Sequence, residues 1–321
     1  MIVSIILLIT GLTLIVLGAN YLVEGASGIA RRFGLSEFII GLTIVGMGTS
    51  APEMVVSFIG AIQGNADIAI GNVVGSNIMN TLLVLGLTAL ILPVAVTPAN
   101  RRRDIPVNIG VTVLVILLGL KHTLFGLGVA DGLGRIDGGI LLTVFLLYIG
   151  WSLRKKKQDL QNGYPAAGEP VRIVRFLLMA LGGLAALIVG GNLFVDNATL
   201  LAKELGVSDK FIAITILAGG TSLPELATCV AAAAKGKQQM ALGNIIGSNI
   251  FNLLLILGGS AVIAPLSFEH VGFVDLGVLL ASSLCLVTAL RVARRNVVDR
   301  VDGFLYLLIW AGYMAYLAIN L

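Results

Sequence analysis

Two glutamates with matching surroundings are the residues of this sequence best suited to chemistry. Glu53 ends the segment GTSAPE at 48–53, and Glu225 ends the segment GTSLPE at 220–225. Both lie inside long apolar stretches, where an ionisable group costs at least a few kcal/mol unless it meets a partner or a watery cavity. The proline before each glutamate lacks a backbone N–H, so each helix is predicted to break beside the carboxylate and to free carbonyl oxygens. Inside a membrane such breaks are tolerated only where they line a cavity.

Further oxygen donors accompany the two carboxylates. The candidates are Thr49, Ser50, Glu53, Ser76 and Asn80 in the first half, Thr221, Ser222, Glu225, Ser248 and Asn252 in the second half, and freed carbonyls near Gly46, Gly48, Ala218 and Gly220. Ser76 and Asn80 are four residues apart, as are Ser248 and Asn252, so each pair shares one helix face. Oxygen-only sets suit Na⁺ and Ca²⁺ rather than Zn²⁺ or Cu²⁺. Two carboxylates would balance the charge of one Ca²⁺ or of two Na⁺.

The polar residues also have a structural interpretation. Ser and Thr in membrane helices often bond only the carbonyl four residues back or a neighbouring helix, and Thr49 or Ser76 taken alone fits that pattern equally well. Asn72 and Asn244 are interpreted as residues that hydrogen-bond between helices. Packing alone does not explain the two glutamates, because both have Pro, Ser and Thr at the same offsets.

An internal repeat relates the two glutamates. Residues 48–86 match residues 220–258 at 19 of 39 positions without a gap, an offset of 172 residues. The predicted divisions are a first unit at 1–153 with its repeat motif at 41–86, a polar cytoplasmic linker at 154–172, and a second unit at 173–321 with its motif at 213–258. Each unit carries five predicted spans. Because five is odd, the second unit enters the membrane from the opposite side, an arrangement typical of secondary transporters.

Composition assigns the chain to a membrane. Of its 321 residues, 57% are hydrophobic and 12% are charged, against about 25% charged in soluble domains. These values exclude a soluble enzyme, a disordered chain and a nucleic-acid binder. The predicted fold is an all-α polytopic membrane protein with ten transmembrane helices, at about 2–23, 38–60, 67–92, 105–120, 137–153, 173–194, 211–234, 239–264, 271–290 and 302–320.

The basic residues predict how the chain is oriented. If the N-terminus lies outside, 17 of the 21 Lys and Arg residues fall in cytoplasmic segments. The four that remain outside are Lys121, Arg135, Lys203 and Lys210. Cytoplasmic loops carry an excess of Lys and Arg, so both termini are predicted to lie outside. The expected location is the cell membrane, which is the inner membrane in a cell that has two.

The segments GTSxPE and GNxxGSNIxN, present once in each half, resemble the α-repeats of the cation/calcium exchanger superfamily, most closely its bacterial and archaeal calcium/sodium antiporters. The resemblance implies that spans two, three, seven and eight surround a midplane site, and that spans one and six move across them to give alternating access. It also implies that the side chains named above bind the cations, together with the carbonyl oxygens of Gly46 and Ala218. Several relatives carry Asp where this chain has Asn252, which argues against a protonatable or K⁺-linked role there.

The predicted function is that of a secondary antiporter, not an enzyme, which exchanges Na⁺ for Ca²⁺ as a monomer without a cofactor. Its partners are the two ions and the lipid bilayer. A proton-coupled Ca²⁺ or Na⁺ antiporter that uses the same glutamates is the alternative, because a carboxylate binds a cation or a proton. An intramembrane hydrolase with Ser50 or Ser222 as nucleophile lacks a His or Lys base within the spans. A passive channel does not account for inverted repeats.

Overall fold

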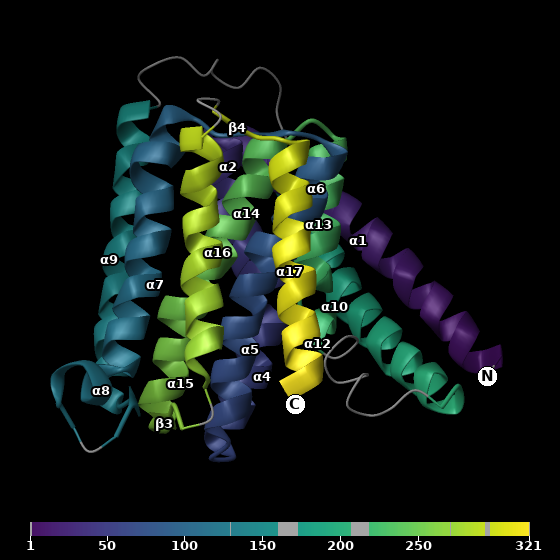
Figure 1. Cartoon of the computed structure of the whole chain (residues 1–321). Helices are drawn as coiled ribbons and strands as arrows, with labels where there is room; N and C mark the ends of the chain where they lie inside the picture. The colour runs from purple at the N-terminus through teal and green to yellow at the C-terminus, as the bar shows by residue number, and fades with distance from the viewer. Residues whose placement is uncertain are drawn as a thin grey trace.

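The chain forms one helical bundle (Figure 1). The computed structural model describes residues 2–128, 130–159, 173–206, 218–269, 271–292 and 296–320. In the first half the helices are α1 (Ile2–Phe33), α2 (Glu37–Ile40), α3 (Gly46–Thr49), α4 (Ala51–Ile62), α5 (Ala66–Met79), α6 (Leu85–Ile91), α7 (Ile105–Gly119), α8 (Lys121–Phe125) and α9 (Arg135–Asp159). In the second half they are α10 (Ile173–Glu204), α12 (Ala218–Gly220), α13 (Leu223–Ala234), α14 (Gln238–Phe251), α15 (Leu257–Ile263), α16 (Phe273–Val292) and α17 (Arg300–Asn320). The prediction of an all-helical membrane protein is therefore confirmed.

Short π-helical turns connect several of these helices within the described ranges. They are η1 (Gly41–Val45), η2 (Asn80–Val84), η3 (Asn100–Asp104) and η6 (Asn252–Ile256). Two of them, η2 and η6, begin at asparagines that are repeat-related and that belong to the candidate ligand set. Single π-turns inside α-helices occur frequently at functional sites, so the irregular backbone marks the same place in both halves.

Six helical stretches are long and apolar enough to cross a membrane: Ile2–Phe33, Ala66–Ile91, Arg135–Ser152, Ile173–Glu204, Gln238–Ile263 and Arg300–Asn320. A seventh consists of Glu37–Thr49 and Ala51–Ile62, which bend by 47° at their break. Within the described residues, the other three predicted spans contain the helices α7, α13 and α16. α13 is short because it starts after a second break, and residues 211–217 of that predicted span lie outside the described ranges.

The helices α1 and α10 form a long pair at one side of the bundle (Figure 1). Each has 32 residues, about 48 Å at 1.5 Å per residue, so each is long enough to cross a bilayer core of about 30 Å with a strong tilt. Small residues let the two backbones meet. A Cβ atom added at Gly18 would lie 2.7 Å from the carbonyl oxygen of Gly183.

Polar contacts join α1 to the loop between α13 and α14. The Nζ atom of Lys235 lies 3.3 Å from Oε1 of Glu24, and that of Lys237 lies 2.6 Å from Oγ of Ser27. The sequence predicted that the first span would end at residue 23, before this polar turn. The helix continues to Phe33 because its polar side chains have partners on the neighbouring loop.

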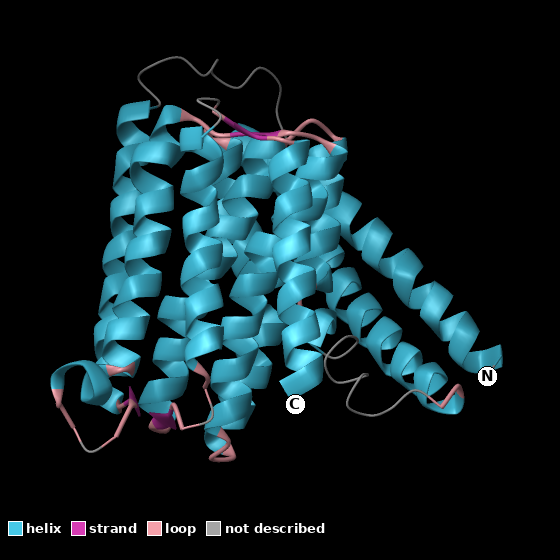
Figure 2. Ribbon diagram, viewed as in Figure 1, coloured by secondary structure: helices cyan, strands magenta, loops and turns pink. Residues whose placement is uncertain are grey.

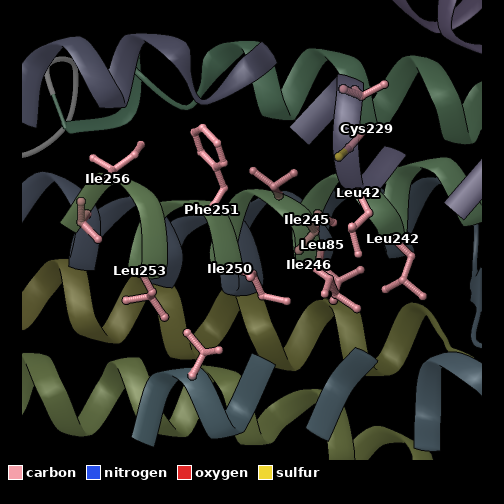
Figure 3. Close-up of a cluster of buried hydrophobic side chains, with 14 of the residues drawn as sticks. Leu42, Leu85, Cys229, Leu242, Ile245, Ile246, Ile250, Phe251, Leu253 and Ile256 are labelled. Carbon is pink, nitrogen blue, oxygen red and sulfur yellow. The ribbon is translucent and has the colours of Figure 1, made fainter. Parts of the chain in front are cut away.

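The repeat-motif helices form the centre of the molecule. In the most apolar stretch of α5–α6, 72% of the residues are buried, and in that of α14–α15, 83% are buried. The corresponding value is only 22% for α1 and for α10. Figure 3 shows the apolar side chains of this core, contributed by α14 together with neighbouring helices. Those labelled are Leu42, Leu85, Cys229, Leu242, Ile245, Ile246, Ile250, Phe251, Leu253 and Ile256. The helices that carry the candidate ligands are thus the ones held most firmly by packing.

Two short antiparallel ribbons lie at opposite ends of the bundle (Figure 2). Strand β1 (Val94–Ala95) pairs with β4 (Val297–Val298), and β2 (Gly132–Leu133) pairs with β3 (Leu266–Ser267). Each ribbon joins a segment of one half to a segment of the other. The sequence does not predict them, because two residues are too few to show an alternating pattern.

Candidate cation site

The helix break expected beside each glutamate is present in both halves. A single residue, Ser50, separates α3 from α4, and two residues separate α12 from α13. Ser50 has φ −81° and ψ 9°, and Ser222 has φ −91° and ψ 7°. The near-identical backbone angles show that the repeated sequence adopts the same break twice.

Proline and glutamate occupy the first turn after each break. Pro52 and Pro224 stand at the start of α4 and α13, where a backbone N–H would have no helical acceptor. Glu53 and Glu225 follow them in the same turn. A carboxylate at a helix N-terminus is favoured by the free N–H groups and by the helix dipole. The local sequence therefore provides each charge with partial compensation.

The two halves exchange hydrogen bonds across the site. The hydroxyl of Ser50 donates to Oε1 of Glu225 over 3.0 Å, and the hydroxyl of Ser222 donates to Oε1 of Glu53 over 3.3 Å. All four residues are fully buried. Each serine thus serves the glutamate of the other half, which brings the two carboxylates to one site.

Several oxygen atoms of this site have no hydrogen-bond partner among the described residues. They are Oε2 of Glu53, Oε2 of Glu225, Oδ1 of Asn80 and Oδ1 of Asn252. Buried polar atoms are nearly always paired in folded proteins. These four oxygen atoms lie on four separate elements, and two of them belong to carboxylates. A bound cation would give all four a partner.

The helices α5 and α14 and their π-turns supply the opposite wall. Ser248 donates to the carbonyl oxygen of Gly46 over 3.2 Å, and Asn252 donates from Nδ2 to Oδ1 of Asn77 over 3.3 Å. Ser76 and Asn80 are buried on the matching face of the first half. All four side chains of the two predicted pairs are thus buried within the protein.

The remaining candidates lie around the two breaks. Thr49 is fully buried at the end of α3, and Thr221 adjoins Ser222 in the second break. Ala218 is the first residue of α12, so its carbonyl belongs to the short helix before the second break. Hydrogen bonds between the halves thus join Ser50 to Glu225, Ser222 to Glu53 and Ser248 to Gly46, whereas the other candidates are placed by their elements alone.

Two asparagines that the candidate ligand set omitted take part in the network. Asn77 donates from Nδ2 to the carbonyl oxygen of Asn249 over 3.4 Å, and Asn249 donates from Nδ2 to Oγ1 of Thr81 over 2.9 Å. They occupy the same position of the repeated GSN motif, 172 residues apart. The repeat itself was the signal that could have found them.

The donor chemistry is uniform. No group of three or more His, Cys, Asp or Glu residues that could hold a metal occurs in the described part of the chain. The site instead combines two carboxylates with neutral hydroxyl, amide and carbonyl oxygens. Such a set suits hard cations of low charge, which need few acidic ligands and accept neutral oxygens.

These features define an all-helical polytopic membrane protein in which two broken helices carry a buried pair of glutamates. The chain belongs to the sodium/calcium exchanger protein family, whose sequence profile matches residues 3–154 and 175–319. The family resemblance of the repeated motifs is thereby confirmed. The chain is a transporter-family protein and not an enzyme, which removes the hydrolase interpretation.

Similar proteins match over nearly the whole chain. CaxA of Alkalimonas amylolytica is 40% identical, with 98% of each chain covered. The inner membrane protein YrbG of Escherichia coli is 37% identical over 90% of this chain and 89% of its own. A solved structure of the sodium-calcium exchanger NCX_Mj, soaked with Na⁺ and Ca²⁺, has a TM-score of 0.83 at 34% identity, with 98% of both chains covered.

Proposed function

We propose that this chain exchanges Na⁺ for Ca²⁺ across the cell membrane by alternating access around the two glutamates. The crossed serine–glutamate bonds carry the proposal, because they hold Oε1 of each carboxylate and leave Oε2 without a partner. Two buried carboxylates without a counter-charge are costly in a low dielectric. A bound cation would offset that cost. The likeness to NCX_Mj, a structure soaked with Na⁺ and Ca²⁺, supports these two ions.

The proposed ligands share one property, an oxygen atom at or beside a helix break. They are Thr49, Ser50, Glu53, Ser76, Asn80, Thr221, Ser222, Glu225, Ser248 and Asn252, with the carbonyl oxygens of Gly46 and Ala218. The two glutamates supply two negative charges, which one Ca²⁺ or two Na⁺ would neutralise. Competition for the same charges is the basis of exchange.

Coupling follows from the cost of the empty site. Without a cation, the two carboxylates would have to change sides of the membrane unneutralised in a low dielectric, which opposes the transition. A site filled with Ca²⁺ or with Na⁺ is neutral and crosses more readily. Each half-cycle therefore requires a cation, and net movement is an exchange.

The helix pair α1 and α10 is the proposed moving element. α10 lies directly over both breaks: a Cβ atom at Gly48 would be 3.2 Å from Leu184, and one at Gly220 would be 2.4 Å from Val195. The pair is also far less buried than the repeat-motif helices, 22% against 72% and 83%. Movement of α10 across the breaks would open the site to one side of the membrane and close it to the other.

The proposed topology has ten spans in two inverted units, 1–153 and 173–321, with both termini outside and the 154–172 linker in the cytoplasm. The N- and C-termini lie at the same end of the bundle, and α9 ends at the opposite one (Figure 1), which supports this arrangement. The name of the inner membrane relative YrbG supports the location. One chain supplies both glutamates and both crossed serines, so a monomer is sufficient.

The experiment is Ca²⁺ uptake into proteoliposomes that contain the purified chain. An outward Na⁺ gradient should drive uptake, whereas a pH gradient of equal size without Na⁺ should not. Glu53→Gln and Glu225→Gln should each abolish the Na⁺-driven uptake. Uptake that follows the pH gradient alone would establish the proton-coupled alternative, and uptake without any counter-ion would indicate a channel.

A further inference from the structure

Two lysines in the loop between α13 and α14 hold the C-terminal end of α1 against the repeat-motif helices. Nζ of Lys235 donates to Oε1 of Glu24 over 3.3 Å and to the carbonyl oxygen of Asn20 over 3.2 Å. Nζ of Lys237 donates to Oγ of Ser27 over 2.6 Å. The three acceptors are three or four residues apart on α1, so they share one face of the helix. These contacts are called the α1 latch below.

Membrane orientation alone explains the presence of lysines in this loop but not their contacts. Cytoplasmic loops carry an excess of Lys and Arg whether or not these residues bind anything. The side chain of Lys235 nevertheless has an exposed fraction of only 28%. Ser27, which accepts from Lys237, is buried with an exposed fraction of 2%. The lysine side chains therefore lie against α1 and do not simply extend into water.

The repeat places the same residue types on α10. At an offset of 172 residues, the three acceptors on α1 correspond to Asn192, Asp196 and Thr199. Oγ1 of Thr199 has no hydrogen-bond partner among the described residues, and Asn192 and Asp196 are exposed. In the corresponding loop between α4 and α5, the lysine positions are occupied by Gln63 and Asn65, which are also exposed. The second copy of the arrangement is therefore present in the sequence, but its parts are separate in this structure.

The inverted repeat gives this difference a meaning. In the proposed topology the α1 latch lies at the cytoplasmic end of the bundle, and the loop between α4 and α5 lies at the outer end. Figure 1 shows α1 beside α13 at one end, whereas the C-terminal part of α10 extends away from the bundle at the other. Because the two units are inverted copies, the state that opens to the opposite side would give α10 the surroundings that α1 has here.

We propose that the α1 latch holds the site closed to the cytoplasm, and that the three corresponding residues on α10 meet the loop between α4 and α5 in the state closed to the outside. The proposal deepens the proposed function and rests on it, because α1 and α10 are assigned there as the moving pair. The two contacts differ in charge. Glu24 pairs with Lys235, whereas Asp196 would meet the neutral Gln63. This ion pair favours the state closed to the cytoplasm.

The experiment measures the distance between two spin labels by electron–electron double resonance, in the purified full chain in lipid nanodiscs. The labels replace two exposed residues, Arg32 near the end of α1 and Ala234 at the end of α13. Cys229 and Cys285 are replaced by serine so that only these positions react. A short distance reports the latched state, and a longer one reports departure of α1 from the loop. The ratio of the long to the short population is the measured quantity.

Glu24→Gln should raise this ratio about two- to fivefold, the effect of losing one partly exposed ion pair. The same change should have almost no further effect when it is added to Lys235→Gln, because the two residues act as one pair. Asp196→Asn is the matched control. It removes the repeat-related acid from an exposed position on α10, and it should not raise the ratio. Equal increases from Glu24→Gln and Asp196→Asn would indicate a general effect of charge and would overturn the proposal.

A variant that adds a contact tests the second copy of the arrangement. Gln63→Lys places a lysine where the other half has Lys235, so that it can pair with Asp196 only in the state closed to the outside. The ratio should rise about two- to fivefold, and Asp196→Asn should cancel the increase. If no long distance is detected when Glu24→Gln and Gln63→Lys are combined, the proposal is wrong. Absence of Na⁺-driven Ca²⁺ uptake by the wild type, with these distance changes intact, would refute the proposed function alone.

Discussion

Replacing Ser50 by alanine should weaken Ca²⁺ binding through Glu225, although Ser50 lies only three residues from Glu53 in the sequence. The hydroxyl of Ser50 donates to Oε1 of Glu225 over 3.0 Å. It keeps its lone pairs for the cation, which polarises the O–H group, so the bond persists and strengthens when the ion binds. Ser50→Ala removes this bond from a fully buried pair.

The magnitude follows from the type of bond. A hydrogen bond to a charged group contributes about 1.5–3 kcal/mol. Each ~1.4 kcal/mol corresponds to a factor of ten in a dissociation constant. Because the bond also exists without the ion, its full free energy is an upper bound on the change in binding, so Ser50→Ala should raise the dissociation constant for Ca²⁺ by about 10-fold and by no more than about 150-fold. Ser222→Ala, whose bond to Glu53 is longer at 3.3 Å, should lie toward the lower end.

The assay is a pair of double-mutant cycles on Ca²⁺ binding, measured by titration calorimetry in detergent. Ser50→Ala should couple to Glu225→Gln by about 1 kcal/mol or more, and to Glu53→Gln by less than about 0.5 kcal/mol. Thr88→Val is the matched control, because this buried hydroxyl bonds only the carbonyl of Val84 in its own helix. Stronger coupling of Ser50 to the glutamate of its own half would refute the crossed arrangement.

Two further predictions concern the moving helix pair and an exposed loop. Gly183→Ala should lower the melting temperature relative to Gly182→Ala, because a Cβ at Gly183 would lie 2.5 Å from the Leu22 backbone nitrogen, while Gly182 has no neighbour within 4 Å. The free energies of unfolding of the two variants, measured by thermal unfolding, should differ by about 1–3 kcal/mol. Equal melting temperatures would contradict the close packing. Hydrogen bonds from Thr123 lower the pKa of Asp131. The contact therefore stabilises the loop fully at a pH above the ordinary pKa of a carboxyl group, and it is lost as the pH falls through the lowered pKa. Thr123→Val should raise that pKa, and hydrogen exchange at the amide of residue 123 should then begin at a higher pH; an unchanged pH profile would show that the bonds have no effect on titration.

The helix breaks could be predicted from the sequence because their cause is local. Pro52 and Pro224 remove a backbone N–H wherever they occur in a helix, and the preceding glycines offer no packing that would oppose a bend. The repeat then predicted that both halves would break alike. The end of α1 was less predictable, because the polar residues beyond the predicted span find partners on the loop between α13 and α14.

The pairing of residues across the site could not be predicted in the same way. Ser50 and Glu53 are neighbours in sequence, yet the tertiary fold directs the serine to Glu225. Asn244 was interpreted as a residue that hydrogen-bonds between helices, and its contacts with Cys229 and Thr49 confirm that interpretation. The sequence alone could not specify which helices it joins, because that depends on how the two inverted units pack.

The most direct test of the shared site is Ca²⁺ binding measured at increasing Na⁺ concentration. Because both ions are proposed to use Glu53 and Glu225, the apparent dissociation constant for Ca²⁺ should rise steadily with Na⁺ and should not reach a plateau. K⁺ at equal ionic strength should have little effect. Ca²⁺ binding that is indifferent to Na⁺, or that is as tight in the Glu53→Gln and Glu225→Gln variants as in the wild type, would contradict a common two-glutamate site.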